Sequence, residues 1–263
     1  MLRKMKKKER KIIEYQDEKN DEFSTAKITP RTIDEHYPYV HKSKIWNAGC
    51  YLCQNILSIP LKYGYAKIKF HLTYIGKENI KPYQKQGYFL YGNHTQAFAD
   101  TFISSNAIYP KRNFFIVNPE NVSMKGLGNF VQLLGAIPIP NHKKGMKPFL
   151  AAIQDKIKRG YSITIFPEAH IWPYYTKIRP FSSVSFGYPV EENVPCFCIT
   201  NTYQARGRKN DKVKIVSYID GPFYPDNRLS KAERKKKLRD TIYECMVKRS
   251  QNSNQQMIEY RKR

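Results

Sequence analysis

Short apolar runs alternate with helix-like segments along the middle of the chain, and no other feature constrains the fold as strongly. Apolar runs that are separated by helices are typical of strands lying parallel in a sheet that is covered on both faces. The sequence therefore predicts an α/β fold, with a mostly parallel or mixed central sheet and helices on both sides. The expected strands are 67–74, 87–92, 113–117, 136–139, 162–166, 195–200 and 212–219, and the expected helices are 97–107, 125–134, 147–158 and 230–249.

The chain divides into four expected regions around one core. No linker rich in Gly, Ser or Pro interrupts the middle of the sequence, and no segment repeats. We expect a basic N-terminal extension over 1–43, an amphipathic helix at a membrane interface over 44–62, the main domain over 63–225, and a basic helix with its tail over 226–263. The Gln- and Asn-rich tail after the last helix is expected to be frayed.

The charge balance indicates an anionic partner. The chain has 46 Lys and Arg residues against 22 Asp and Glu residues, a formal net charge of +24, and the basic residues are densest in 1–11 and 231–239. The partner can be a nucleic acid, an acidic membrane surface or a phosphorylated substrate, and a basic face exposed to solvent is the alternative. The odd, low count of 5 cysteines favours a reducing compartment, with packing rather than metal binding as the role of the cysteines.

An uncharged segment over 45–61 is too short and too polar for a membrane-spanning helix. Its apolar residues recur at helical spacing and Lys44 and Lys62 flank it, a pattern typical of a helix that lies in a membrane interface. The alternative is an amphipathic helix packed on its own domain. Because no apolar signal region follows the basic N-terminus, we expect a cytoplasmic protein, peripheral or monotopic on the cytoplasmic face of the membrane.

Residues suited to catalysis follow two of the expected strands. In a parallel sheet, ligands gather beyond the carboxyl ends of the strands. The run YFLYG ends in Asn93 and His94, with Asp100 shortly after, and the run SITIF ends in Pro-Glu-Ala-His with Glu168 and His170. A carboxylate on one ring nitrogen of a histidine leaves the other nitrogen free to accept a proton, which predicts His94 and Asp100 as a general-base pair. A structural pair is the alternative, and His170 is the rival base.

Four segments together resemble a known family. GNHTQAFADTF, GAIPIPN, TIFPEA and VPCFCIT are similar, in this order, to the four blocks of the glycerolipid (lysophosphatidic acid-type, PlsC-like) acyltransferases, over about residues 65–225. The resemblance implies a glycerol-phosphate acyltransferase-like α/β fold with an N-terminal helical membrane anchor. It also implies transfer of an acyl group from acyl-CoA or acyl-carrier protein to a hydroxyl of a lysophospholipid, with 1-acylglycerol-3-phosphate as the first acceptor. His94 is then the base, Asp100 supports it, and no cofactor or metal is expected.

The sequence departs from the family pattern at three positions. Five residues separate His94 from Asp100 where the family has four, Asn141 follows the second block where an arginine is usual, and Ala169 replaces a glycine. These departures indicate a divergent member with its own acceptor.

Further residues are expected to bind substrate. Glu168 is placed beside the base, and backbone N–H groups near Asn93 or at 194–195 are the expected donors to the oxyanion. Basic residues on nearby loops are candidates for a phosphate of the acceptor, although surface lysines are common. The expected substrate-binding residues are Asn93, Glu168, Asn141, Lys143, Lys144, Lys177 and Arg179. Glu168 can alternatively cap a helix or pair with Arg179, and the aromatic run 172–175 is either a lid over acyl chains or loop packing.

Two other functions stay open at this point. One is a catalytically inert lipid-binding member of the same fold. The other is a nucleic-acid-binding protein, in which the basic residues and 20 tyrosines supply phosphate contacts and stacking platforms. No nucleic-acid motif supports the second, so the expected partners are an anionic membrane surface, the acyl donor and the lysophospholipid. The sequence lacks a complete G-x-S-x-G, phosphate-loop or G-x-G-x-x-G motif, which argues against those enzyme classes.

Overall fold

The computed structural model describes residues 11–23, 28–97, 99–207 and 212–263. Nearly all of the basic run 1–11, which we expect to bind anionic lipid, lies outside the described residues.

A mixed seven-stranded sheet forms the centre of the fold, as the sequence predicts. The strand order is β2-β8-β7-β3-β6-β4-β5, and every neighbouring pair is parallel except β7 and β8. The strands are β2 Thr73–Ile75, β3 Tyr88–Gly92, β4 Asn113–Val117, β5 Ala136–Pro138, β6 Ser162–Ile165, β7 Cys196–Arg206 and β8 Lys212–Phe223.

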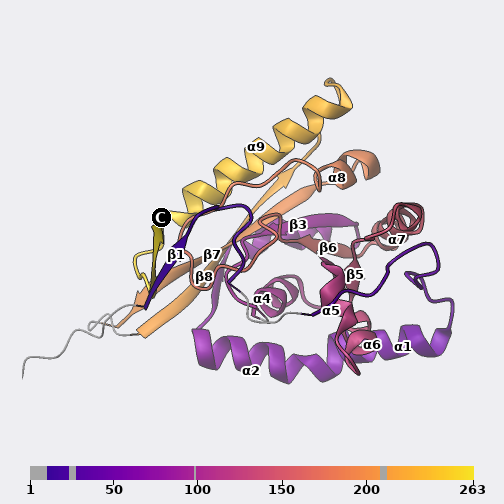
Figure 1. Cartoon of the computed structure of the whole chain (residues 1–263), viewed down its shortest axis with the longest axis horizontal. Coiled ribbons are helices and arrows are strands. Elements are labelled where there is room, and N and C mark those ends of the chain that lie inside the picture. Colours follow the sequence, from indigo (N-terminus) through magenta and orange to yellow (C-terminus); the bar gives the residue numbers. More distant parts are fainter. Residues whose placement is uncertain (1–10, 24–27, 98, 208–211) are drawn as a thin grey trace, which may run out of the picture.

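Helices cover both faces of this sheet (Figure 1). On one face lie α2 and α4, and on the other lie α7, α8 and α9. The helices are α1 Lys44–Leu52, a π-helical stretch Cys53–Leu57, α2 Ser58–Phe70, α3 Lys77–Ile80, α4 Ala99–Ile108, α5 Pro119–Ser123, α6 Gly128–Leu133, α7 Met146–Lys158, α8 Gly187–Glu192 and α9 Lys231–Ser250, with short 3-10 turns at Lys81–Tyr83 and Lys143–Gly145.

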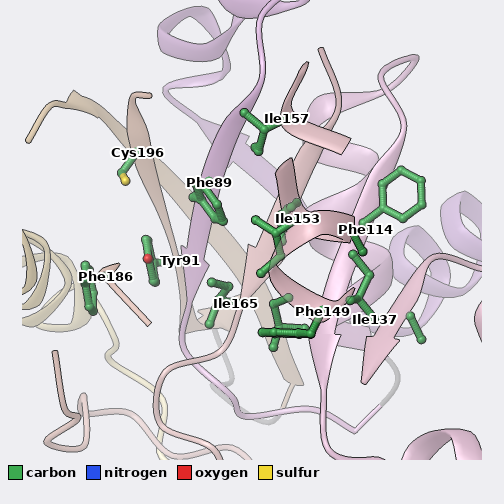
Figure 2. Packing of buried hydrophobic residues seen from close by; sticks show 14 of the residues in the cluster. Phe89, Tyr91, Phe114, Ile137, Phe149, Ile153, Ile157, Ile165, Phe186 and Cys196 are labelled. Atoms are coloured by element: carbon green, nitrogen blue, oxygen red, sulfur yellow. The ribbon is translucent and has the colours of Figure 1, made fainter. Parts of the chain in front are cut away.

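The central strand β3 divides the core into two clusters. All of its residues are buried, and side chains of successive residues point to opposite faces of the sheet. Phe89 and Tyr91 belong to the cluster on the α7, α8 and α9 side, and Figure 2 shows them in the same cluster as Phe149 and Ile153 of α7. Tyr88 and Leu90 belong to the cluster with α2 and α4. Apolar burial on both faces is the reason that this strand reads as a continuous apolar run in the sequence.

The expected strand over 67–74 is wrong. Instead, α1, the π-helical stretch and α2 follow one another without a break as far as Phe70, and the strand begins only at Thr73. Ala66 and Phe70 are both buried while Ile68 is 78% exposed, so the buried positions follow the spacing of a helix. The helix ends at His71, which takes the left-handed conformation common at helix ends.

The expected frayed tail is also wrong. Residues Ile258–Lys262 form β9, which pairs in parallel with β1, Lys11–Tyr15, at the opposite end of the sequence. Figure 1 shows β1 beside the C-terminus. The partner of each strand therefore lies at the far end of the chain.

The sheet topology determines where catalytic residues can gather. The parallel strands β3, β6 and β4 end at one edge, so the residues after them are neighbours. The longer β7 also runs parallel to β3, with Ile199 paired to Gly92, and therefore carries Asn201 past the end of β3.

Candidate active site

His94 and Asp100 meet at this edge of the sheet. The His94 Nδ1 atom lies 3.0 Å from the Asp100 Oδ2 atom, and their side chains are 15% and 0% exposed. Asp100 is in the first turn of α4, so the extra residue between the two is taken up in the turn before the helix. With the Nδ1 proton donated to Asp100, Nε2 is the nitrogen able to accept a proton.

Backbone groups hold the Asp100 carboxylate in place. Its Oδ2 atom accepts the N–H groups of Thr95 at 2.7 Å and Gln96 at 2.8 Å. The N–H group of His94 donates to Glu168, and that of Val194 to the carbonyl of Pro189. The N–H groups of His94, Thr95, Gln96 and Val194 thus already have partners and Pro195 has no N–H group, so none of these five residues offers a free donor to an oxyanion.

Asn201 is a site residue that the sequence analysis missed. Its Nδ2 atom donates to the Asp100 Oδ1 atom at 3.1 Å, and its Oδ1 atom accepts from the Ser217 hydroxyl at 2.6 Å. Its backbone forms two bonds with the Asn93 side chain, of 2.8 and 3.0 Å. The expected strand ended one residue earlier, and the signal that could have extended it is the polar Thr-Asn-Thr sequence within an otherwise apolar run.

Asn93 therefore joins two strands. It is 1% exposed, and both polar atoms of its side chain bind the backbone of Asn201 on β7.

Tyr203 forms hydrogen bonds to the turn that follows His94. Its hydroxyl donates to the Thr95 Oγ1 atom at 2.7 Å and accepts from the Gln96 side chain at 3.1 Å. Burial, and secondarily the Asp100 charge, raise the pKa of Tyr203 well above its ordinary value. The phenol therefore stays a neutral hydrogen-bond donor to the turn that carries His94.

Glu168 and Arg179 form a buried pair behind His94. Their side chains are 1% and 0% exposed, and the Arg179 Nη2 atom lies 3.4 Å from the Glu168 Oε2 atom. Glu168 also accepts the N–H groups of His94 at 3.1 Å and Arg179 at 2.9 Å. Burial raises the pKa of Glu168, while Arg179 and the two N–H groups act in the opposite direction. The sequence left substrate binding, helix capping and a pair with Arg179 open for Glu168, and the structure contains the pair with Arg179.

Ala169, at the position of the family glycine, takes a strained conformation. Its φ is 63°, in the left-handed region that costs a residue with a Cβ atom about 1 kcal/mol. The turn after β6 therefore keeps a glycine-like shape.

A cavity of about 720 Å³ opens beside His94. Its size is within the range of small-molecule sites. Phe166, whose ring stacks on that of His94 at a centroid distance of 4.6 Å, forms part of the wall. The larger part of the lining is apolar and includes Phe115, Ile116, Val117, Ile139, Ile165 and Tyr188. Besides His94, the polar lining residues are Glu22, Thr29, Thr101, Asn118, Glu120, Asn121, His170, Ser182 and Ser185.

The residues expected to bind a phosphate lie outside this cavity. Both polar atoms of the Asn141 side chain bind backbone, the carbonyl of Arg31 at 2.9 Å and the N–H of Ile33 at 2.8 Å. The exposed Lys144 lies 3.6 Å from Glu35. Within the described part of the chain, no Lys or Arg lines the cavity, so the structure does not bring the following expected residues into it: Asn141, Lys143, Lys144, Lys177 and Arg179.

Possible metal ligands gather elsewhere. Among the described residues, one group, Cys198, Asp220 and Cys245, has its ligand atoms within 4.8 Å of one another. The two sulfur atoms are 3.8 Å apart, and Asp220 is engaged by the Arg249 guanidinium. None of the three lines the cavity.

A His–Asp pair at the carboxyl edge of an α/β sheet, beside a cavity, is an arrangement that can take a proton from a group bound in that cavity. Comparison with known proteins makes this chemistry specific. A family model described as acyltransferase matches residues 71–202, half of the chain, and the chain belongs to this acyltransferase family.

Among solved structures, the chain is similar to the 1-acyl-sn-glycerophosphate (LPA) acyltransferase PlsC from Thermotoga maritima. The two are 17% identical with a TM-score of 0.54, and the match covers 81% of this chain and 85% of that chain. The two proteins share a fold. No curated protein matches the sequence.

Proposed function

We propose that this protein transfers an acyl group from acyl-CoA or acyl-carrier protein to a hydroxyl of a lysophospholipid, with 1-acylglycerol-3-phosphate as the first acceptor to test. The observation that carries the proposal is the His94–Asp100 pair, which directs one ring nitrogen to a buried carboxylate at the wall of a mainly apolar cavity. Membership of the acyltransferase family supports the same reaction.

The chemistry needs one base. The Nε2 atom of His94 accepts the proton of the acceptor hydroxyl as its oxygen attacks the thioester carbon. The C–S bond then breaks, and the leaving thiolate takes that proton from the imidazolium. Asp100 fixes the tautomer and stabilises the imidazolium meanwhile, so no acyl-enzyme is required. A positioned base of this kind contributes about 10²–10⁴ to the rate.

We further propose that the helix over residues 44–70 rests in the membrane interface. Its polar side chains Gln54 and Asn55 are 3% and 7% exposed, whereas Ile45, Leu57 and Ile68 are 85%, 62% and 78% exposed. A helix packed only on a water-soluble domain has the opposite arrangement. An apolar face turned outwards suits the boundary of a lipid layer, where basic residues nearby add attraction to anionic lipid. Of the helices in the described residues, none is both long and apolar enough to span a bilayer.

The test is acceptor-dependent release of free thiol from acyl-CoA with dispersed lysophosphatidic acid. Wild type, His94→Ala and His170→Ala are compared, each shown to be folded by circular dichroism. We expect turnover that collapses only in His94→Ala. Collapse in His170→Ala instead would assign the base to the rival histidine.

The alternatives give different outcomes. If no donor or acceptor in a panel that includes acyl-carrier protein and other lysophospholipids supports turnover, but the protein sediments with anionic vesicles, the inert lipid-binding function is correct. A salt-sensitive gel shift with oligonucleotides would favour the nucleic-acid function.

A further inference from the structure

The N-terminal segment 11–23, which we call the strap, lies far before the residues that match the family model, yet it contacts the loop that follows β6. Its first part, β1, is tied to the C-terminal strand β9. Residues from the strap and from β9 pack against Trp172, which is 0% exposed. The ring of Trp172 stacks on the ring of Tyr260, with the two centroids 5.0 Å apart. It also contacts the rings of Tyr15 and Phe23, at centroid distances of 4.8 Å and 5.1 Å.

Backbone carbonyls of the strap accept hydrogen bonds from two side chains of the loop that follows β6. The Trp172 Nε1 atom donates to the carbonyl of Asp21 at 2.8 Å, and the Arg179 Nη1 atom donates to the carbonyl of Glu18 at 3.2 Å. The Arg179 guanidinium also lies over the Trp172 ring, 5.0 Å from its centroid. Two buried side chains with large surfaces thus fix the strap to the loop.

The same loop holds the backbone of His94 on both sides. The N–H group of Trp172 donates to the carbonyl of His94 at 3.1 Å. On the other side, Glu168 accepts the N–H group of His94 at 3.1 Å and is itself bound by Arg179. A short chain of contacts therefore leads from the strap, through Trp172 or Arg179, to the peptide groups of the proposed base.

The strap also reaches the cavity. Glu22 lies 2.6 Å from the Nδ1 atom of His170, and both residues line the cavity that contains His94. Part of the substrate-facing wall is therefore built from a segment outside the family match.

We propose that the strap is a positioning element of the active site, which acts through Trp172 and Arg179 to hold His94 with Nδ1 on Asp100 and Nε2 towards the cavity. The proposal rests on the function proposed above. Because a displacement of about 1 Å in a reacting group can lower the rate about 100-fold, loss of this support lowers kcat more than substrate binding. The aromatic run 172–175 then serves in positioning the base rather than as a lid over acyl chains.

The sequence offers a direct probe, because Trp172 is one of only 2 tryptophans. In a full-length Trp46→Phe chain, used as the reference, the fluorescence reports on Trp172 alone. The strap variant carries Tyr15→Ala and Phe23→Ala. The matched control is Tyr37→Ala, which removes a buried aromatic ring that packs on Tyr39 rather than on Trp172.

We expect the strap variant to show red-shifted emission and stronger quenching by acrylamide. Its kcat falls about tenfold or more, while KM for the acyl donor stays within about twofold. The control keeps the emission maximum of the reference, and its kcat stays within about twofold of the reference value. We expect this even if the melting temperature of the control falls as far as that of the strap variant. A red shift with unchanged kcat would overturn the positioning role. An unchanged emission would show that the aromatic contacts do not hold the strap, and would overturn it as well.

A second readout separates this proposal from the proposed function. If the reference chain transfers no acyl group, the proposed function fails, but the ¹⁵N resonances of the His94 ring, assigned with His94→Gln, still report its tautomer. We expect a single tautomer, with the proton on Nδ1, in the reference and a mixture in the strap variant. The same single tautomer in both would contradict the positioning role without any measurement of turnover.

Discussion

The cluster of His94, Asp100 and Asn201, which we call the corner, and the helix over 44–70 both bury polar side chains, but with different consequences. At the corner, Asp100 and Asn201 are 1% and 4% exposed, and their bonds hold one imidazole at a cavity. In the helix, Gln54 bonds to the carbonyl of Leu133 and receives a bond from Arg112, which fixes the helix to the domain and leaves apolar residues facing outwards. Buried polar groups therefore position the His94–Asp100 pair in one region and determine which side chains face outwards in the other.

The largest expected effect is at the corner. His94→Ala removes the proposed base, so we expect kcat to fall by about 10²–10⁴. Sedimentation with anionic vesicles should be unchanged, because the helix is untouched. A variant that loses vesicle binding as well, while folded, would mean that the two regions are not separable.

Replacing the exposed pair Ile56 and Leu57 with glutamine tests the other region. These residues are 51% and 62% exposed. Because transfer of each side chain into an apolar phase contributes about 1.5–3 kcal/mol when complete, we expect vesicle partitioning to fall about 100-fold. Turnover of a water-soluble, short-chain acceptor should persist. The matched control is Ile75→Gln, which changes an exposed isoleucine on the edge strand β2 and should bind vesicles as the wild type does.

Asn201→Ala sharpens the account of the corner. It removes the donor to the Asp100 Oδ1 atom but keeps both catalytic side chains. A buried group left without its partner costs about 1–3 kcal/mol, so we expect kcat to fall about tenfold. Steady-state kinetics measure this loss. Ser217 lies one hydrogen bond further from Asp100, so Ser217→Ala is expected to lower kcat less. Equal losses in the two variants would indicate a general loss of stability.

The smallest expected effect concerns the inner side of the helix. Gln54→Leu leaves the Leu133 carbonyl and the Arg112 side chain without this partner. We expect the free energy of unfolding to fall by about 1–3 kcal/mol in a denaturant titration, with kcat unchanged. A stable variant would show that these bonds do not hold the helix to the domain.

The sequence predicts the centre of the molecule well because local patterns and topology agree there. Buried parallel strands read as continuous apolar runs, and their carboxyl ends share one edge of the sheet. The meeting of His94 and Asp100 could therefore be predicted despite their longer spacing. The stretch 67–74 failed because alternating apolar residues also fit the final turn of a helix that buries Ala66 and Phe70.

The remaining features depend on contacts between distant segments. Asn201 could not be predicted as part of the site because β7 is longer than its apolar run, and its pairing with β8 determines that length. The pairing of β1 with β9 joins segments near the two ends of the chain, and the Arg179 side chain donates a hydrogen bond to the carbonyl of Glu18 in the strap. No local pattern distinguishes a buried arginine that binds Glu168 from an exposed one that binds a phosphate.

The most direct test measures product and vesicle binding on the same samples of wild type, His94→Ala and the Ile56→Gln, Leu57→Gln variant. Isotope-labelled acyl-CoA and dispersed lysophosphatidic acid serve as substrates, and mass spectrometry detects the acylated lipid. We expect His94→Ala to sediment with vesicles but to form at least about 100-fold less product than wild type, and the helix variant to form product but not to sediment. Product formation by folded His94→Ala at the wild-type rate would contradict this expectation, because the transfer would then not depend on the proposed base.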